Sequence, residues 1–257
     1  NTFLLADAEV VPHPVDEEGI VLNERPCDYY YVTPGHQVPT GVTMSSARRR
    51  QLLEHAARHD AVIIEDDYDS ESNFTLNPLP ALKASDRSGR VVYVSSLSKA
   101  LSPGLRLGFM VADPDLIDEA RALRRLVYRH PPTNIQYQMA HFLAQGHYET
   151  HLRRYHYDSA QRWERLHAAL QRYLPSCRAL AGSEHANAFW LQTPAQINTQ
   201  QLTWRAAHAG VLIEPGARHF LNAAPPDNYF RMGFHAINPD AIAQGVEVLR
   251  GQLEQMG

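Results

Sequence analysis

The sequence has few cysteines, no long apolar run and no excess of positive charge, and each shortage excludes a class of protein. Its two cysteines, Cys27 and Cys177, lie far apart and lack metal-ligand spacing, so a disulfide scaffold is not expected and a reducing cytoplasm fits better. No apolar run approaches the roughly 20 residues of a membrane-spanning helix, and no signal peptide is visible. The formal net charge of -4 provides no global basic field for nucleic acid. We therefore expect no membrane partner, and DNA contact would require a local patch or a segment outside this chain.

The composition is that of an ordinary soluble globular protein. The chain has 257 residues, of which 44% are hydrophobic and 20% are charged, enough for one large domain or two modest ones. It begins with Asn1 rather than Met, and the stretch Asn1–Val11 reads as apolar core sequence without a polar lead-in. This beginning predicts that the chain is a piece of a longer protein.

The first half alternates strand-like and helix-like segments. An N-cap at Ser45-Ser46 begins one helix, and Asp113-Pro114 begins another, whose apolar stripe includes Leu116 and Leu123. A polar loop is expected from Ser70 to about Ser88. Strands are predicted at 29–32, 61–64, 91–94 and 107–111. This order predicts a layered α/β domain with right-handed crossovers.

The second half predicts a smaller α+β unit. Its long helical stretch, 148–173, is rich in arginine and glutamate, which suits a helix that joins two domains. The other helices are expected at 134–145, 199–209 and 239–253, and the strands at 188–192, 211–213 and 229–234.

Lys99 follows the apolar run Val91–Val94, at the predicted carboxyl edge of the sheet, where ligands of open α/β sheets bind. A lysine amine that attacks an aldehyde must be activated, by partial burial or by a neighbouring cation. Ser96 and Ser98 can donate hydroxyl hydrogen bonds, and Arg106 follows a Pro-Gly turn that can fold it back. This cluster suits a phosphate dianion. An ordinary surface loop with one lysine and one arginine is the alternative.

The acidic run Glu65-Asp66-Asp67-Tyr68 follows another apolar strand. A carboxylate that faces a pyridine nitrogen keeps it protonated, so that the ring can accept electrons from a substrate carbanion. A neighbouring tyrosine hydroxyl can hydrogen-bond a phenolate oxygen of such a ring. An acidic surface loop and a hard-metal site are the alternatives, although a metal would lack further ligands of recognisable spacing.

Two further segments become informative in combination with these. Thr33–Gly41 links a strand to a capped helix and is, on its own, a Pro/Gly turn. Arg231 lies on a predicted strand, where alternation puts Arg231 and Gly233 on one face and Phe230 and Met232 on the other. Such an arginine is either paired internally or aimed at a ligand carboxylate, which its planar fork binds with two hydrogen bonds.

Together these segments resemble the fold-type I pyridoxal-phosphate enzymes of the class I/II aminotransferase superfamily. They resemble more closely the aminotransferase-like domain of MocR-type regulators in the GntR family. The likeness is carried by His-Gln-x-Pro-Thr-Gly, Glu-Asp-Asp-Tyr-Asp-Ser-Glu, Ser-Leu-Ser-Lys-x-Leu-x-Pro-Gly-Leu-Arg-Leu-Gly, His130-Pro131-Pro132 and Gly146–Arg154. It implies an α/β fold with a partial large domain, 1–148, built on a mixed, mostly parallel sheet. A long linking helix and a small α+β domain would follow over 149–257.

The resemblance also implies a role for each candidate residue. Lys99 would be the catalytic residue and form the Schiff base with pyridoxal 5'-phosphate. Arg231 would bind the α-carboxylate of an amino acid, and no metal is implied. The remaining cofactor contacts would be Asp66 at the pyridine nitrogen, Tyr68 at the phenolate oxygen, and Ser96, Ser98 and Arg106 at the phosphate.

The chain departs from the family's pattern in several places. Val38 stands where aminotransferases usually have asparagine, and valine cannot donate to the ring oxygen, so Gln37 or His36 substitutes or the contact is absent. Asp66 and Asp67 are adjacent, and the choice of Asp66 rests on the family register. The family's upstream segment, with its stacking aromatic residue and phosphate-binding loop, is not in this chain. We therefore expect the piece alone to bind the cofactor poorly.

Three hypotheses about function follow. The favoured one is a transcriptional regulator that senses an amino acid or related amine through Lys99, dimerises, and contacts DNA only through a winged-helix domain absent here. The second is a catalytic aminotransferase that acts on an amino acid and a 2-oxo acid. The third is a non-catalytic interaction domain that kept the fold, which covalent capture of the cofactor at Lys99 would exclude.

Overall fold

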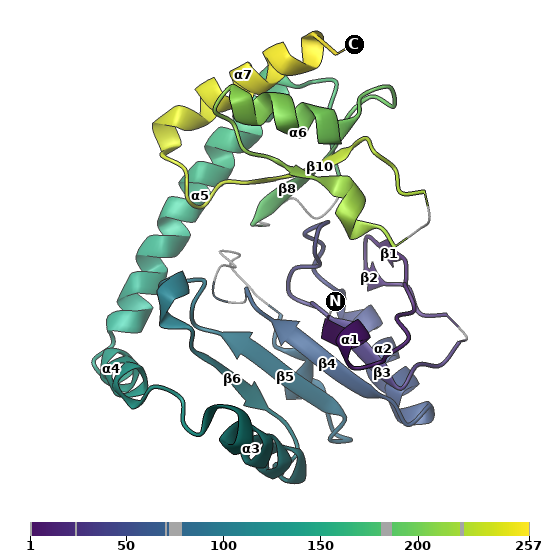
Figure 1. Ribbon diagram of the computed structural model, residues 1–257, viewed down its shortest axis with the longest axis vertical. Helices are drawn as coiled ribbons and strands as arrows, with labels where there is room; N and C mark the ends of the chain where they lie inside the picture. Colours follow the sequence, from purple (N-terminus) through teal and green to yellow (C-terminus); the bar gives the residue numbers. More distant parts are fainter. Residues whose placement is uncertain are drawn as a thin grey trace.

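The computed structural model describes residues 2–23, 25–69, 71, 79–180, 187–221 and 224–256. These residues form two principal sheets, connected by a long helix (Figure 1). The N-terminal sheet consists of β3 (Tyr29–Val32), β4 (Val62–Asp67), β5 (Val91–Ser96) and β6 (Gly108–Val111), in that order. The first three strands are parallel and β6 is antiparallel to β5, which confirms the expected mixed, mostly parallel sheet.

Helix α2 (Ser46–Arg58) covers one face of this sheet. Ser45 caps it as predicted, because the Ser45 side chain accepts a hydrogen bond from the Arg48 N–H at 3.1 Å. Leu52 is fully buried and shares one core cluster with Ile63 of β4. This core holds α2 against the sheet. The short elements nearby are α1 (Thr2–Leu5), the strands β1 (Val15–Asp16) and β2 (Gly19–Ile20), and the 3-10 turns η2 (Leu82–Ser85) and η3 (Pro103–Leu105).

One sequence prediction near this sheet is wrong, and another concerns residues that lie partly outside the described ranges. The stretch Asn1–Val11 was predicted to be core sequence, but Leu4 is 59% exposed and Leu5 is 87% exposed. This segment lies at the margin of the sheet, where the ring of Phe3 meets Tyr31 of the edge strand edge-on at 5.3 Å. The predicted polar loop from residue 70 to about 88 lies outside the described residues at 70 and 72–78, and its later part forms η2.

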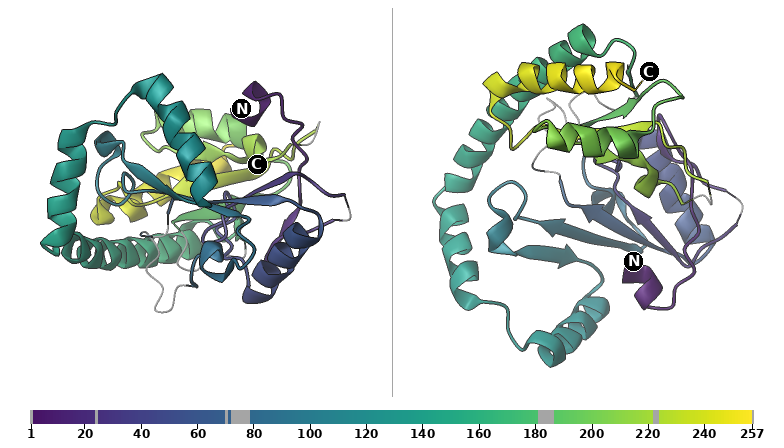
Figure 2. Two further views of the ribbon diagram at one scale, coloured as in Figure 1. Left: turned by 90° about the horizontal axis from the view of Figure 1, so that it is seen from below. Right: turned by 45° about the horizontal axis from the view of Figure 1, so that its top comes forward.

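Three helices lead from the first sheet to the second. They are α3 (Pro114–Tyr128), α4 (Thr133–Ala144) and α5 (His147–Tyr173). Asp113 caps α3 as predicted, but the apolar stripe of this helix is exposed, with Leu123 at 63%. α5 runs along one side of the molecule, past both sheets (Figure 2). No helix within the described residues is long and apolar enough to cross a membrane.

The C-terminal sheet is antiparallel, with the strand order β7-β8-β10-β9. Its strands are β7 (Arg178–Ala179), β8 (Ala188–Gln192), β9 (Glu214–Pro215) and β10 (Tyr229–Gly233). Its helices are α6 (Thr199–His208) and α7 (Ile242–Glu254), with the 3-10 turns η4 (Gly216–His219) and η5 (Pro239–Ala241). Phe189, Phe230 and Leu249 are fully buried in a core that α5 completes with Leu166.

The strand predicted at 211–213 is wrong, since β9 begins only at Glu214. Gly210 has a φ of 86° and leads the chain away from α6 in the left-handed conformation. The N–H of Val211 still donates to the carbonyl of Ala206, at 2.8 Å. The apolar run therefore forms the exit from a helix, and Ile213 reaches the core without strand pairing.

Candidate functional site

Loops that carry chemistry meet at the carboxyl end of the N-terminal sheet, where β3, β4 and β5 all end. The loop after β4 carries Tyr68 and Asp69, and the loop after β5 carries Lys99. The segment Thr33–Gly41, which follows β3, contacts the loop after β4, because the Tyr68 hydroxyl donates to the carbonyl of His36 at 3.5 Å. The parallel sheet thus brings together segments that lie far apart in the sequence.

Lys99 is surrounded by an acid and a phenol ring. Its Nζ lies 2.6 Å from Oδ1 of Asp69 and 4.5 Å from the centre of the Tyr68 ring. Burial lowers the pKa of Lys99 below its ordinary value, and the cation of Arg231 lowers it further, while Asp69 opposes both. A lowered pKa enlarges the neutral fraction of the amine, which is the form that attacks a carbonyl group.

Asp66 and Asp67 point to opposite faces of the sheet, as neighbours on a strand do. Asp66 accepts a hydrogen bond from the hydroxyl of Tyr31, while Asp67 accepts one from the hydroxyl of Tyr93 at 2.7 Å. Glu65 is buried and accepts the backbone N–H groups that begin η2, at 2.6 and 2.8 Å. The three carboxylates diverge, and among the described residues no cluster of three or more His, Cys, Asp or Glu could hold a metal ion.

The residues around Val38 arrange the donors differently from the family's asparagine. The Gln37 side chain donates to the carbonyl of Val38 at 3.2 Å and so turns back onto its own loop. His36 is buried, and its Nδ1 lies 3.1 Å from the side-chain nitrogen of Asn187. Neither side chain supplies a donor beside Lys99, where the nearby hydroxyl is that of Tyr68. Burial is the main cause that raises the pKa of Tyr68, so its hydroxyl keeps its proton and can donate it.

The predicted phosphate residues order the loop between β5 and β6. The N–H of Ser98 donates to Oγ of Ser96 at 3.2 Å, and the N–H of Leu107 donates to Oγ of Ser98 at 3.3 Å. Each hydroxyl therefore accepts from the backbone and retains its own proton for a further acceptor. Arg106 has a left-handed conformation, with a φ of 48°, and its side chain is exposed. The structure thus brings the two serines together, while Arg106 reaches into solvent.

Arg231 lies on β10, with Phe230 and Met232 buried on the opposite face as predicted. Its Nη1 is 3.3 Å from Oε2 of Glu214, the residue directly across from it on β9. The field of its cation adds to the lowering of the Lys99 pKa that burial causes, and it partly offsets the raising of the Tyr68 pKa that burial causes. Arg231 is therefore paired internally and, at the same time, acts electrostatically on the Lys99 site.

The sequence analysis did not identify Asp69, Asn187 and His235, which form a chain of hydrogen bonds that begins at Lys99. Asn187 donates to Oδ2 of Asp69 through its side-chain nitrogen, and its Oδ1 accepts from Nε2 of His235 at 2.9 Å. Asp69 belongs to the acidic phrase that was recognised, and the other two residues flank the predicted strands 188–192 and 229–234. Those positions were the available signal, but no local pattern shows that they meet.

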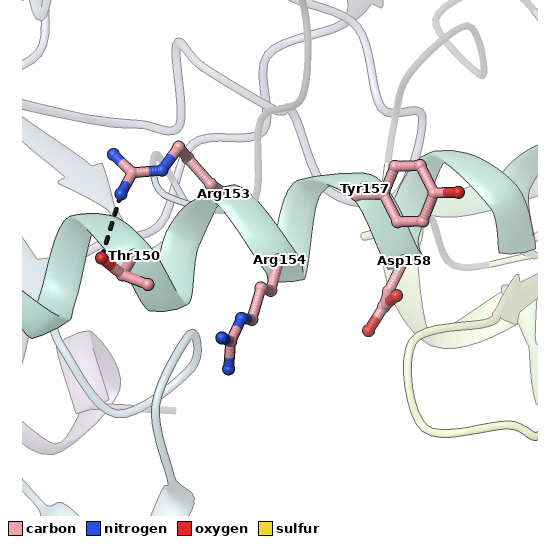
Figure 3. Close-up of a pocket in the computed structure, with 5 residues that line it drawn as sticks. All are labelled: Thr150, Arg153, Arg154, Tyr157 and Asp158. Carbon is pink, nitrogen blue, oxygen red and sulfur yellow. Dashed lines mark hydrogen bonds between the residues drawn. The ribbon is translucent and has the colours of Figure 1, made fainter.

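The outer side of α5 carries a separate, shallow hollow of about 340 Å³ (Figure 3). In this hollow Arg153 donates to the hydroxyl of Thr150 at 2.9 Å. The residues of α5 that face the Lys99 loops are different ones: His151 bonds the carbonyl of Ala100, and His156 bonds that of Glu71, both at 2.6 Å. We therefore assign the functional site to the sheet edge and not to this hollow.

Comparisons with known proteins give the same picture. Residues 32–249 match the family described as aminotransferase class I and II. The HTH-type transcriptional regulator TauR of Rhodobacter capsulatus is 39% identical over 93% of this chain and 50% of its own length. The probable rhizopine catabolism regulatory protein MocR of Rhizobium meliloti is 35% identical over 97% of this chain and 51% of its own length. The chain thus spans about half the length of these curated relatives.

Two solved structures share the fold. Pyrococcus horikoshii kynurenine aminotransferase, in complex with PMP, superposes with a TM-score of 0.86 at 26% identity, covering 95% of this chain and 63% of that one. LysN, the α-aminoadipate aminotransferase of Thermus thermophilus, complexed with N-(5'-phosphopyridoxyl)-L-leucine, also reaches 0.86 at 28% identity, covering 95% and 65%.

Proposed function

This chain belongs to the aminotransferase class I and II family, and from that premise we propose that it is the ligand-sensing part of a transcriptional regulator. Its fold is that of the fold-type I pyridoxal-phosphate aminotransferases, and the family and its complexed structures indicate pyridoxal 5'-phosphate as the cofactor. The observation that carries the proposal is a partly buried Lys99 amine of lowered pKa at the sheet edge. The regulators that resemble this chain at 39% and 35% identity support the regulatory reading.

The side chains at the sheet edge fit this cofactor. When bound, pyridoxal 5'-phosphate supplies an aldehyde and an electron-accepting ring. In the proposed arrangement Lys99 offers its amine to the aldehyde, and Tyr68, which keeps its proton, donates to the ring oxygen. Asp66 accepts from the ring nitrogen, beside the hydrogen bond that it accepts from the Tyr31 hydroxyl. The hydroxyl protons of Ser96 and Ser98 are donated to the phosphate, and the exposed side chain of Arg106 turns back from solvent to join them.

The rest of the regulator is proposed along with it. The ligand is an amino acid or a related amine, the protein is a homodimer, and DNA is bound through a winged-helix domain that this chain does not contain. Such a protein works in the cytoplasm, where the DNA is. We divide the chain into a partial cofactor-binding domain, 1–148, and a unit with the linking helix and small domain, 149–257. Two separate hydrophobic cores support this division.

Arg231 is the proposed anchor for the ligand's carboxylate, and its replacement is expected to act selectively. Arg231→Gln should weaken an amino-acid ligand by about tenfold to a hundredfold, the range for one charge-assisted hydrogen-bond pair. An amine without a carboxylate should bind as before. Spectral titration of the cofactor-loaded whole protein measures both affinities. Arg218→Gln is the matched control, since Arg218 also contacts Glu214, at 3.3 Å, but is 64% exposed. Equal losses for both ligands would contradict the assignment.

Catalytic transamination is the second candidate, because the residue types that the family's chemistry needs are present at this edge. One experiment separates the two functions. The whole protein, loaded with cofactor, is mixed with amino-acid donors and 2-oxo acids, and its DNA binding is measured in parallel. A regulator changes its DNA affinity with the amino acid and gives no multiple turnovers of keto product. Steady turnover without any effect on DNA binding would overturn the regulatory proposal.

A further inference from the structure

A buried chain of hydrogen bonds runs from Lys99 to the helix α5. Lys99 pairs with Asp69, Asp69 accepts from Asn187, and Asn187 accepts from His235. Nδ1 of His235 lies 3.1 Å from the hydroxyl of Tyr155 and 3.1 Å from that of Ser159, both on α5. We call Asp69, Asn187 and His235 the relay residues. They come from three segments: Asp69 from the loop after β4, Asn187 directly before β8, and His235 from the second position after β10.

The direction of each hydrogen bond in the relay is fixed by the chemistry of its ends. An ionised Asp69 only accepts, so Asn187 must turn its NH₂ group toward it and its oxygen toward His235. His235 must then carry its proton on Nε2, which leaves the single lone pair of Nδ1 to be shared between the two hydroxyls of α5. Burial lowers the pKa of His235 to about 4, and Lys99, Arg162 and Arg231 lower it while Asp69 raises it, so the ring is neutral.

Two of the relay residues are too deeply buried for water to replace a lost partner, since Asp69 is 3% exposed and Asn187 is 6% exposed. His235 is half-buried, and Ser159, to which it is bonded, is 1% exposed. A buried carboxylate that loses an opposing cation suffers a large desolvation cost, and a buried amide that loses an acceptor suffers a smaller one. The loss of a hydrogen-bond partner at one end of the relay therefore changes the stability of the hydrogen bonds at the other end.

We propose that the relay residues are positioning residues, which couple the charge state of the Lys99 amine to the seating of the C-terminal sheet on α5. While Lys99 is a free ammonium group, Asp69 is neutralised and holds Asn187 and, through it, His235. When the Lys99 nitrogen is engaged elsewhere, Asp69 loses that cation, and β10 with Arg231 is released from the sheet edge. The inference deepens the proposed function, because it names the route by which events at Lys99 reach the second sheet.

A double-substitution cycle on the whole protein, without cofactor, tests this coupling. Lys99→Met removes the cation, Asn187→Ala cuts the relay, and hydrogen exchange of peptides from β10 and α5 reports the seating. Each single substitution should speed exchange there by about tenfold to a hundredfold, the effect of one buried hydrogen bond to a charged group. The double variant should exchange no faster than either single one, because the same connection is already broken. Asn134→Ala, at an exposed position of α4, should change nothing.

Independent structural roles give a different result. If the two effects multiply in the double variant, or if Lys99→Met leaves exchange in β10 unchanged, the relay does not couple the sites. Asp69→Ala provides a second variant should Asn187→Ala not fold, because it removes the acceptor of Asn187, and it should likewise speed exchange in β10 and α5. It should also lower the pKa of Lys99, seen as a lower midpoint in the pH profile of its reaction with acetic anhydride. Because no step uses the cofactor, failure here leaves the proposed function untouched, and failure of cofactor capture leaves the relay untouched.

Discussion

Replacing Lys99 with alanine is expected to abolish the response of the whole protein to its ligand. Without an ε-amine beside Tyr68, no covalent bond to a carbonyl group can form at this edge. DNA binding measured with and without cofactor and amino acid should therefore show no ligand-dependent change, while the wild type shows one. The predicted effect is a complete loss, since nothing else in the site supplies an amine.

The chain contains its own control for this experiment. It has two lysines in all, Lys83 and Lys99. Lys83 lies on η2, where its Nζ pairs with Asp86 at 3.1 Å. Lys83→Ala should keep the full ligand response. A ligand response that survives in Lys99→Ala, or that disappears equally in both variants, would contradict the role given to Lys99.

Replacing Arg49 with methionine is expected to cause the largest loss of stability. This buried guanidinium donates to three backbone carbonyls, those of Met44, Pro80 and Pro34, at 3.0, 2.7 and 3.0 Å. Methionine fills similar space but donates nothing, so all three carbonyls lose the guanidinium as a donor, although that of Pro34 keeps the backbone N–H of Met44 at 2.9 Å. The free energy of unfolding should fall by about 3–5 kcal/mol, the range for removal of one buried charged partner.

Urea denaturation measures this loss, and the neighbouring position supplies the control. Arg50→Met makes the same chemical change at an exposed site of α2 and should cost less than about 0.5 kcal/mol. Because Pro34 belongs to the loop beside Tyr68, Arg49→Met should also weaken cofactor binding under conditions where the variant is folded. Similar midpoints for the two variants would show that Arg49 does not hold these loops.

Local sequence rules predicted most of the elements in this fold. Ser45 and Asp113 mark helix starts because a cap needs only its own next turn, and Phe230 and Met232 are buried because alternation along one strand decides it. The rules failed where a distant neighbour decides the outcome. The apolar segment before residue 12 is exposed because little of the described chain packs on it, and 211–213 is not a strand because the helix exit holds it.

The same limit applies to the site. Lys99 and Tyr68 meet because both follow parallel strands, which the sequence shows. Asn187 bonds Asp69 across 118 positions, from a segment with no motif of its own, so the relay is visible only in three dimensions. The pairing of Arg231 with Glu214 is likewise a contact between strands. The sequence did not predict it, because no strand was expected at Glu214.

The most direct measurement of the central claim is to find which lysine captures the cofactor. The whole protein is incubated with pyridoxal 5'-phosphate, reduced with borohydride and digested, and the peptides of this chain are analysed by mass spectrometry. Our account predicts a phosphopyridoxyl group on Lys99, because its lowered pKa and its position at the sheet edge favour reaction. It predicts none on Lys83, which is paired with Asp86. A chain modified on Lys83 alone, or on neither lysine at saturating cofactor, would contradict it.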